Sequence, residues 1–218
     1  MKTALFIPIK LNNQRLPGKN LMNLNGRPLC DYIFSTVAKL GTIDEKYVYC
    51  SDEKVKQYMP QSIRFMKRSE HLDGSDVKGT EIIEHFLRDV CADLYVLTHV
   101  TQPFTKAESI EIAVDKVLHE GYDSAFSAVE LRDYCWFRGR PLNYSIDDLV
   151  TTQNLEPVYM ETGAFFVFWR DVFETTGRRI GKKPYMHIVD NFERIDIDTM
   201  DDFSLAEAVA MYKYPAQW

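Results

Sequence analysis

The sequence predicts an α/β fold in which a mostly parallel, doubly wound sheet is covered on both faces by helices. Apolar runs of strand length alternate with helical patterns of about 10–15 residues, as expected for βαβ units. The 218 residues suffice for one well-cored domain and are few for two. A composition of 45% apolar and 27% charged residues is typical of a folded globular chain.

The first half of the chain supplies four of the expected strands. Strands are predicted at 3–9, 46–50, 63–66 and 94–99, and helices at 28–40, 80–90 and briefly after Asp52. Pro28 suits the first turn of its helix, where its missing N–H is not needed. Ser51 or Asp52 is well placed as the N-cap of the short helix.

The second half continues the rhythm and then breaks it. A helix is predicted at 106–119, a strand at 124–129, further strands at 163–169, 185–189 and 195–198, and a last helix at 200–212. The stretch 131–157 is rich in aromatic residues, Pro, Asn and Asp, and indicates irregular structure or a hairpin that protrudes from the core. We therefore expect a single domain over residues 1–218 with one excursion.

Charge and composition argue against several classes of partner. The net charge of −6 argues against nucleic acid and anionic membranes. No apolar run approaches the roughly 20 residues that span a bilayer. Because Pro8 and Lys10 interrupt the first apolar run, no signal peptide is recognised and a cytoplasmic location is expected. The four cysteines are scattered, which predicts buried, reduced thiols.

The loop after the first strand carries the clearest chemical pattern. In open α/β sheets, ligands bind beyond the carboxyl ends of the strands. Residues 10–20 hold three cations, four amide side chains and Gly18. Such a loop can direct backbone N–H groups and lysine charges at phosphate oxygens. A merely solvated polar loop is an equally good interpretation of its composition, and no Walker A motif is present.

Two carboxylates recur at the end of the chain, in the segment 195–199 of sequence Ile-Asp-Ile-Asp-Thr. In a strand, Asp196 and Asp198 project from the same face. Neighbouring carboxylates repel unless a cation joins them, and hard oxygen ligands suit Mg²⁺. The alternative is that one of them caps the last helix, as Thr199 or Asp201 also can. The spacing favours a metal role.

No constellation for nucleophilic catalysis is present, since the sequence lacks G-x-S-x-G. The five histidines show no metal-ligand spacing, and His85 and His119 are predicted to be surface or packing residues of helices. His99 differs from them because it ends the apolar strand at the ligand edge of the sheet.

Taken together, these segments resemble the acylneuraminate cytidylyltransferase family, which includes the CMP-N-acetylneuraminic acid synthetases and, more distantly, the CMP-Kdo synthetases. The first loop falls in the frame of the family's A-R-x-x-S-K-G-x-P-x-K-N opening. Four further segments match in order: Gly26-Arg27-Pro28-Leu29, Ser51-Asp52, Thr101-Gln102-Pro103-Phe104 and Thr162-Gly163-Ala164-Phe165-Phe166. The segment 195–199 matches I-D-I-D-T outright. The likeness extends over nearly the whole chain.

The resemblance implies a Rossmann-like nucleotidyltransferase fold and a homodimer in which the 131–157 excursion reaches the partner. It also implies that CMP is moved from CTP to a small acidic acceptor with loss of pyrophosphate. By likeness, the nucleotide-binding residues are Lys10, Asn12, Arg15, Gly18, Lys19, Asn20, Arg68 and, after a one-residue insertion, Thr80. Asp196 and Asp198 would hold Mg²⁺. The charges of Lys19, Lys10 and Arg15 would stabilise the leaving pyrophosphate.

The acceptor side departs from the family pattern. In an ungapped alignment, an arginine that reads the sugar acid becomes Thr152, a lysine becomes an aromatic residue within 134–137, and a glutamine becomes His99. Lys10 also replaces an arginine. The acceptor is therefore either a sialic-acid-like sugar acid or a phosphonate such as 2-aminoethylphosphonate, with a slight preference for the phosphonate. The acceptor-binding residues predicted on this basis are His99, Gln102, Trp136, Tyr159 and Glu161.

Two other classes of function are compatible with parts of the pattern. A GT-A-like glycosyltransferase also uses a D-x-D metal site on a Rossmann-like sheet, although that motif normally follows a strand in mid-chain. A non-catalytic nucleotide-binding protein would fit the departures in the first loop, but it has less need of both Asp196 and Asp198. The enzyme is the preferred interpretation.

Overall fold

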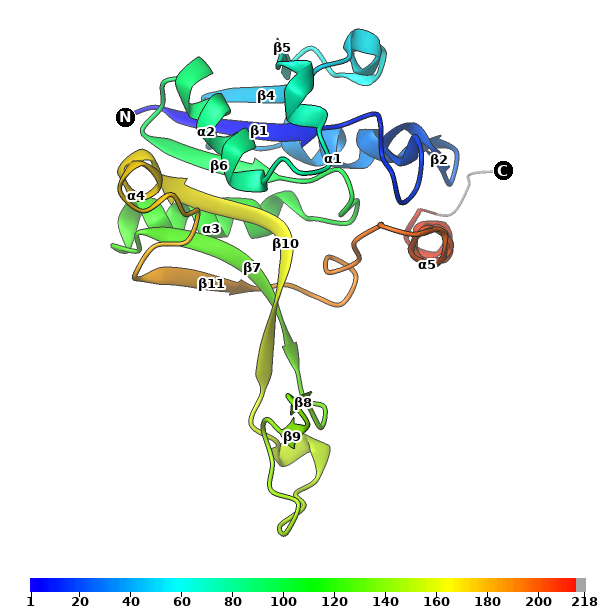
Figure 1. Ribbon diagram of the computed structural model, residues 1–218, viewed down its shortest axis with the longest axis vertical. Coiled ribbons are helices and arrows are strands. Elements are labelled where there is room, and N and C mark those ends of the chain that lie inside the picture. Colours follow the sequence, from blue (N-terminus) through cyan, green and yellow to red (C-terminus); the bar gives the residue numbers. More distant parts are fainter. Residues whose placement is uncertain (215–218) are drawn as a thin grey trace.

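The computed structural model describes residues 1–214 and contains a central seven-stranded sheet (Figure 1). Its strands are β1 (Thr3–Ile9), β4 (Glu45–Cys50), β5 (Arg64–Lys67), β6 (Leu94–Thr98), β7 (Ser124–Leu131), β10 (Val158–Trp169) and β11 (Pro184–Ile188). The spatial order is β11-β7-β10-β6-β1-β4-β5, and β10 runs antiparallel to both of its neighbours. The other pairs are parallel, so the predicted fold class is confirmed.

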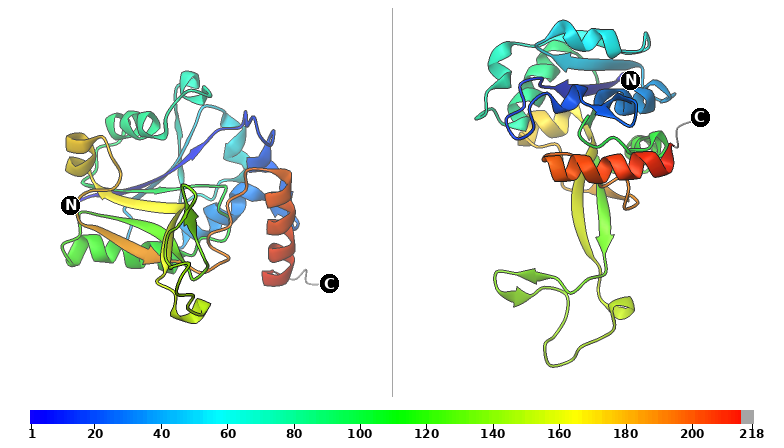
Figure 2. Two further views of the ribbon diagram at one scale, coloured as in Figure 1. Left: turned by 60° about the horizontal axis from the view of Figure 1, so that its bottom comes forward. Right: turned by 90° about the vertical axis from the view of Figure 1, so that its right-hand side faces the viewer.

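Both faces of the sheet are apolar and both are covered. In β1, Leu5 and Ile7 pack into one core cluster, whereas Ala4 and Phe6 pack into the other, because successive side chains of a strand point to opposite faces. The first cluster includes side chains of α1 (Leu29–Ala38), α3 (Ala107–His119) and α5 (Met200–Lys213). The second includes side chains of α2 (Gly79–Asp89) and α4 (Arg170–Thr176). Figure 2 shows these two helical layers.

The prediction of a strand at 195–198 is wrong. These residues follow a turn and belong to no sheet. Their backbone–backbone hydrogen bonds, among the described residues, go to loops rather than to a strand. The Ile197 N–H, for example, donates to the Thr101 carbonyl 2.8 Å away. Thr199 caps α5 in a capping box with Asp202, so neither Asp196 nor Asp198 serves as the cap. The other predicted strands and helices are present, with differences at their ends.

A long arm leaves the sheet where β7 and β10 continue beyond their neighbours (Figure 1). The register of this pair shifts between Glu161 and Phe166, and Gly163 adopts φ 78°, a left-handed conformation that favours glycine. The tip of the arm carries β8 (Trp136–Phe137), β9 (Arg140–Pro141) and the 3-10 turn η4 (Thr152–Asn154). This segment covers the residues for which the sequence predicts an excursion.

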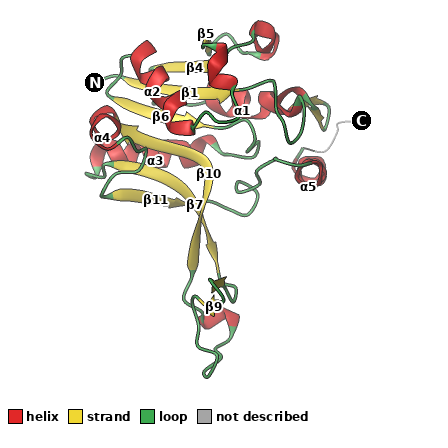
Figure 3. Ribbon diagram, viewed as in Figure 1, coloured by secondary structure: helices red, strands yellow, loops and turns green. Residues whose placement is uncertain are grey.

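Loops that follow β1, β4 and β6 gather at one edge of the sheet, beside α5 (Figure 3). The first two loops contain η1 (Lys19–Leu21), the short pair β2 (Asn23–Leu24) and β3 (Arg27–Pro28), and η2 (Glu53–Tyr58). The segment after β5, which is parallel to β4, starts from the same edge and contains η3 (Glu70–Asp73). As β1, β4 and β6 are parallel, this is the carboxyl edge, where α/β proteins place ligands.

Within residues 1–214, no helix is long and apolar enough to cross a membrane. Cys30 and Cys50 are buried free thiols, as predicted. The same prediction is wrong for Cys91, which is exposed, and for Cys135, which is half-exposed in the arm. The assignment of residues 1–218 to one domain stays a prediction, and positions 215–218 lie outside the described residues.

Candidate active site

A cavity of about 360 Å³ opens at the carboxyl edge of the sheet. Three segments form most of its wall: the loop after β1, the stretch from Arg68 through η3 to α2, and the end of β6 at His99. The predicted site residues that line it are Lys10, Arg15, Lys19, Arg68 and His99. The cavity therefore collects cations from segments far apart in the sequence.

The first loop is held by its own hydrogen bonds. Gly18 has φ 69°, which lets the chain turn into η1, and the Lys19 N–H donates to the Leu16 carbonyl. Asn20 Nδ2 donates to the Lys10 carbonyl 2.7 Å away. The side chains of Lys19 and Asn20 are buried. The loop is therefore held in a defined conformation with two buried polar side chains, which favours the ligand-binding interpretation over a merely solvated loop.

The loop meets the Asp196–Asp198 segment although the two lie 178 residues apart in the chain. Lys19 Nζ donates to the Ile197 carbonyl at 2.6 Å and to Asp198 Oδ1 at 2.8 Å. Arg15 Nη1 lies 2.8 Å from Asp198 Oδ2. Lys19 is 7% exposed and Arg15 is 69% exposed, so the first ion pair is fixed and the second can exchange with solvent.

Asp196 and Asp198 are carboxylate donors of the kind that suits a hard cation. Surrounding protein atoms raise the pKa of Asp196, and the negative charge of Asp198 adds to that rise. Asp196 nevertheless keeps contact with solvent, and Asp198 is partly exposed. Two solvent-accessible carboxylates whose negative charges repel each other are the kind of oxygen ligands that Mg²⁺ takes in nucleotide sites. The residues present therefore fit that ion.

Arg68 is a buried cation aimed at the cavity. It is 3% exposed, and its Nη2 donates to Asp73 Oδ1 at 2.6 Å. Ser51 Oγ donates to the other oxygen of Asp73 at 2.5 Å. Among residues 1–214, Arg68 Nε and Nη1 have no hydrogen-bond partner. Because buried polar groups are normally paired, these two donors are available to a bound anion or carbonyl.

Four predicted nucleotide-binding residues do not line this cavity. Two of them, Gly18 and Asn20, belong to the loop that forms its wall, and the other two, Asn12 and Thr80, line other hollows. Asn12 lines a neighbouring hollow together with Asp52 and Asp73. Thr80 is exposed in the first turn of α2 and lines another hollow with Arg178 and Arg179. Their assignment to the nucleotide stays a prediction.

On the acceptor side, His99 and Glu161 share a neighbour that sequence reasoning missed. Burial lowers the pKa of His99 to about 4, and the positive charge of Arg179 adds to the effect, so its ring is neutral at pH 7. Arg179 Nη2 also donates to Glu161 Oε1 at 3.2 Å, and its guanidinium lies 3.6 Å from the ring centroid of Phe166. No motif marks Arg179, since it lies in the turn after α4.

The remaining acceptor predictions are not gathered at the cavity. Gln102 is buried and donates to the Thr162 carbonyl, while its Oε1 has no hydrogen-bond partner in the part of the chain that the structure describes. Tyr159 is exposed on β10 at the root of the arm. Trp136 is exposed in β8 at the arm tip, away from the sheet (Figure 1). Within one chain, the structure does not bring Trp136 to the cavity.

Comparison with known proteins identifies the family of this chain. The cytidylyltransferase family matches residues 4–207. An N-acylneuraminate cytidylyltransferase of Streptococcus agalactiae serotype V is 24% identical over 93% of this chain and 52% of its own length. The chain thus spans about half the length of the first curated relatives that it matches. A CMP-N,N'-diacetyllegionaminic acid synthase of Legionella pneumophila is 28% identical over 95% of both chains.

Solved structures share the fold. A CMP:2-keto-3-deoxy-manno-octonic acid synthetase complexed with CTP superimposes with a TM-score of 0.72 at 15% identity, covering 98% of this chain and 100% of that one. The 4-diphosphocytidyl-2C-methyl-D-erythritol synthase of Anaerococcus prevotii gives 0.67 at 14% identity, with 96% of each chain covered. With a family match over most of the chain and this fold, the protein belongs to the cytidylyltransferase family, and the predicted resemblance to acylneuraminate cytidylyltransferases is confirmed.

Proposed function

We propose that this chain transfers CMP from CTP to a small acidic acceptor and releases pyrophosphate. The observation that carries the proposal is the contact of Lys19 and Arg15 with Asp198 at the edge of a cation-lined cavity. This arrangement brings the cations that would bind phosphate next to a carboxylate that would bind the metal. Membership of the cytidylyltransferase family supports CTP as the donor.

In the reaction, an acceptor oxygen attacks the α-phosphorus of CTP in line, the bond to the β-phosphate oxygen breaks, and pyrophosphate leaves with the electron pair. Such transfers depend on position and charge rather than on covalent help from the protein. Lys10, Arg15 and Lys19 would stabilise the charge that develops on pyrophosphate. The two unpaired donors of Arg68 would hold a polar group of the nucleotide.

Magnesium would be held by Asp196 and Asp198. When bound, it would neutralise charge on the phosphates. Arg15, which is 69% exposed, would then turn from Asp198 toward the nucleotide, whereas the buried Lys19 keeps Asp198 and the Ile197 carbonyl in place.

For the acceptor we favour a sugar acid, because the relatives quoted above are named for N-acylneuraminate and N,N'-diacetyllegionaminic acid. Arg179 offers a cation for a carboxylate beside the neutral His99. A phosphonate such as 2-aminoethylphosphonate remains the second candidate. Its ammonium would pair with Glu161, which in this structure already accepts a hydrogen bond from Arg179.

The first test is release of pyrophosphate from CTP and Mg²⁺ over a panel containing N-acetylneuraminic acid, Kdo and 2-aminoethylphosphonate. We expect release with one sugar acid, and a loss of about 10²-fold or more in Asp198→Asn, because the carboxylate charge is removed from the reacting phosphates. Release of a free nucleoside diphosphate would instead indicate a glycosyltransferase. CTP binding without turnover on any acceptor would indicate a binding protein and overturn the proposal.

We also propose that the arm joins two copies of the chain in the cytoplasm. Its tip leaves large apolar side chains more than half exposed: Trp136, Phe137, Leu142, Ile146 and Leu149. Apolar patches of this kind mark interaction surfaces in soluble proteins. In such a dimer, the arm of one copy would bring the aromatic rings of Trp136 and Phe137 toward the cavity of the other copy.

The double variant Trp136→Ala/Phe137→Ala should therefore sediment as a monomer, where the wild type sediments as a dimer. The two rings supply a large share of the exposed apolar area of the tip, and their loss removes it from the interface. Met211→Ala, an equally exposed apolar position on α5, is the matched control and should remain dimeric. A wild-type protein that is monomeric at all concentrations would contradict the proposal.

A further inference from the structure

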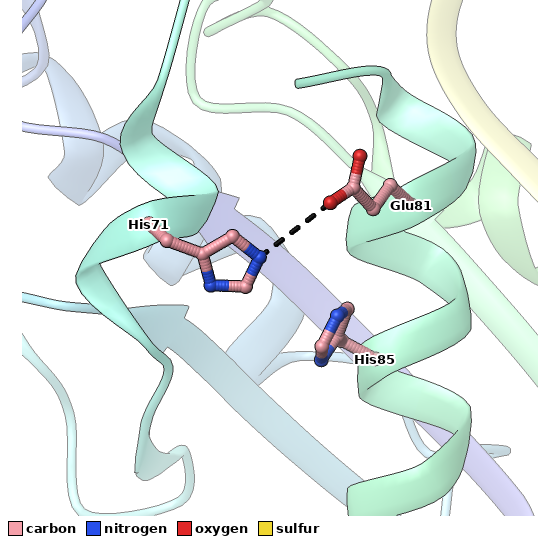
Figure 4. A group of neighbouring side chains, drawn as sticks. All are labelled: His71, Glu81 and His85. Atoms are coloured by element: carbon pink, nitrogen blue, oxygen red, sulfur yellow. Dashed lines mark ion pairs between the residues drawn. The ribbon is translucent and has the colours of Figure 1, made fainter.

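Three metal-ligating side chains converge on the surface near the candidate active site but outside its cavity. His71 comes from η3, and Glu81 and His85 come from α2 (Figure 4). One donor atom of each lies within 4.8 Å of the donors of the other two. The spacing of histidines in the sequence does not reveal this group, because His71 and α2 come together only in the folded chain.

The geometry of the group is set by both elements. Glu81 and His85 are four residues apart on one helix and therefore lie on the same face, one turn apart. His71 Nδ1 lies 3.1 Å from Ser69 Oγ, which leaves Nε2 directed at Glu81 Oε1, 3.5 Å away. A hydrogen bond at one ring nitrogen that orients the other is the usual arrangement around a histidine that ligates a metal.

We propose that His71, Glu81 and His85 form a binding site for a divalent transition-metal ion of the zinc class. Two imidazoles and one carboxylate are a set of ligands that Zn²⁺ accepts, with the fourth position left to water. Bonds of about 2.0–2.2 Å place tetrahedral ligand atoms about 3.3–3.6 Å apart. The three side chains are exposed or half-exposed, so rotation about their side-chain bonds closes the present spacing.

Such an ion would join two segments of the cavity wall. Leu72 and Ile82, which each follow a proposed ligand in the sequence, line the candidate nucleotide cavity. Asp73 in the same turn as His71 pairs with Arg68. The proposed site contains neither Asp196 nor Asp198. A bound ion would fix η3 against α2.

The test is Zn²⁺ binding to the metal-stripped, full-length protein by calorimetry, without nucleotide. We expect one tight site that His71→Ala or His85→Ala weakens by more than the roughly 10–100-fold that loss of an outer-shell partner costs. Asp198→Asn should keep the tight site, which distinguishes it from ion binding at Asp196 and Asp198. The thermal midpoint of wild type should rise with Zn²⁺, and that of His85→Ala should not.

The matched control is His119→Ala. His119 and Asp115 are also four residues apart on a helix, with Nε2 and Oδ1 3.8 Å apart, but they lack a third ligand among the described residues. This variant should bind Zn²⁺ as the wild type does. Equal Zn²⁺ affinity of wild type, His71→Ala and His85→Ala, with all three folded by circular dichroism, would show that His71 and Glu81 form only an ion pair and would overturn the proposal.

Discussion

Replacing Lys19 by Met should lower kcat for CMP transfer by about 10²–10³-fold, the cost of losing one preorganised group that stabilises charge in a transition state. Lys19 is buried and fixed by the Ile197 carbonyl and Asp198, so its ammonium needs no reorganisation when charge develops on pyrophosphate. Met retains most of the side-chain volume, which keeps the packing of the loop. The measurement is steady-state pyrophosphate release with saturating CTP and acceptor.

The size of this effect separates a catalytic charge from a merely structural one. If Lys19 only anchors the Asp198 segment, the substitution raises KM for CTP and leaves kcat near its wild-type value. Lys39→Met, at an exposed lysine after α1, is the control and should not change either constant. A kcat for Lys19→Met equal to that of the control would exclude Lys19 from the stabilisation of pyrophosphate.

The sequence was sufficient to identify the two halves of this cluster, but not their contact. The loop after the first strand and the 195–199 segment were recognised from their residues, and the structure joins them through Lys19 and Asp198. The reason given for the second half was wrong, however. The segment pairs with no strand among the described residues; the Ile197 N–H donates to the Thr101 carbonyl, and the Ile197 carbonyl accepts from Lys19 Nζ. The carboxylates are positioned by tertiary contacts.

Other parts of the site could not be predicted because they depend on contacts between distant segments. Arg179 reaches Glu161 and Phe166 from a turn without any motif. The pairing of Arg68 with Asp73 depends on the path of the chain between β5 and α2. For the histidine cluster, the spacing of Glu81 and His85 in a predicted helix was a readable signal. His71 was not, since no periodicity relates it to that helix.

Asp73→Ala should lower the free energy of unfolding by about 3 kcal/mol, at the lower end of the range for breaking a buried ion pair, because Asp73 itself is 21% exposed. The substitution leaves the 3% exposed Arg68 with a buried charge and no carboxylate, and it also removes the acceptor of Ser51 Oγ. Urea denaturation followed by circular dichroism measures the change.

The double variant Arg68→Met/Asp73→Ala tests the cause of that loss. If the cost comes from an unpaired buried charge, removal of both partners should recover part of it, because the methionine carries no charge to desolvate. Glu84→Ala, which breaks the exposed pair with Arg88 on α2, should cost less than about 1 kcal/mol and serves as the control. A double variant no more stable than Asp73→Ala would place the cost in Asp73 itself. The buried charge of Arg68 would then cost little without a carboxylate partner. Such a result is expected of a cation whose role is to bind the ligand of the cavity.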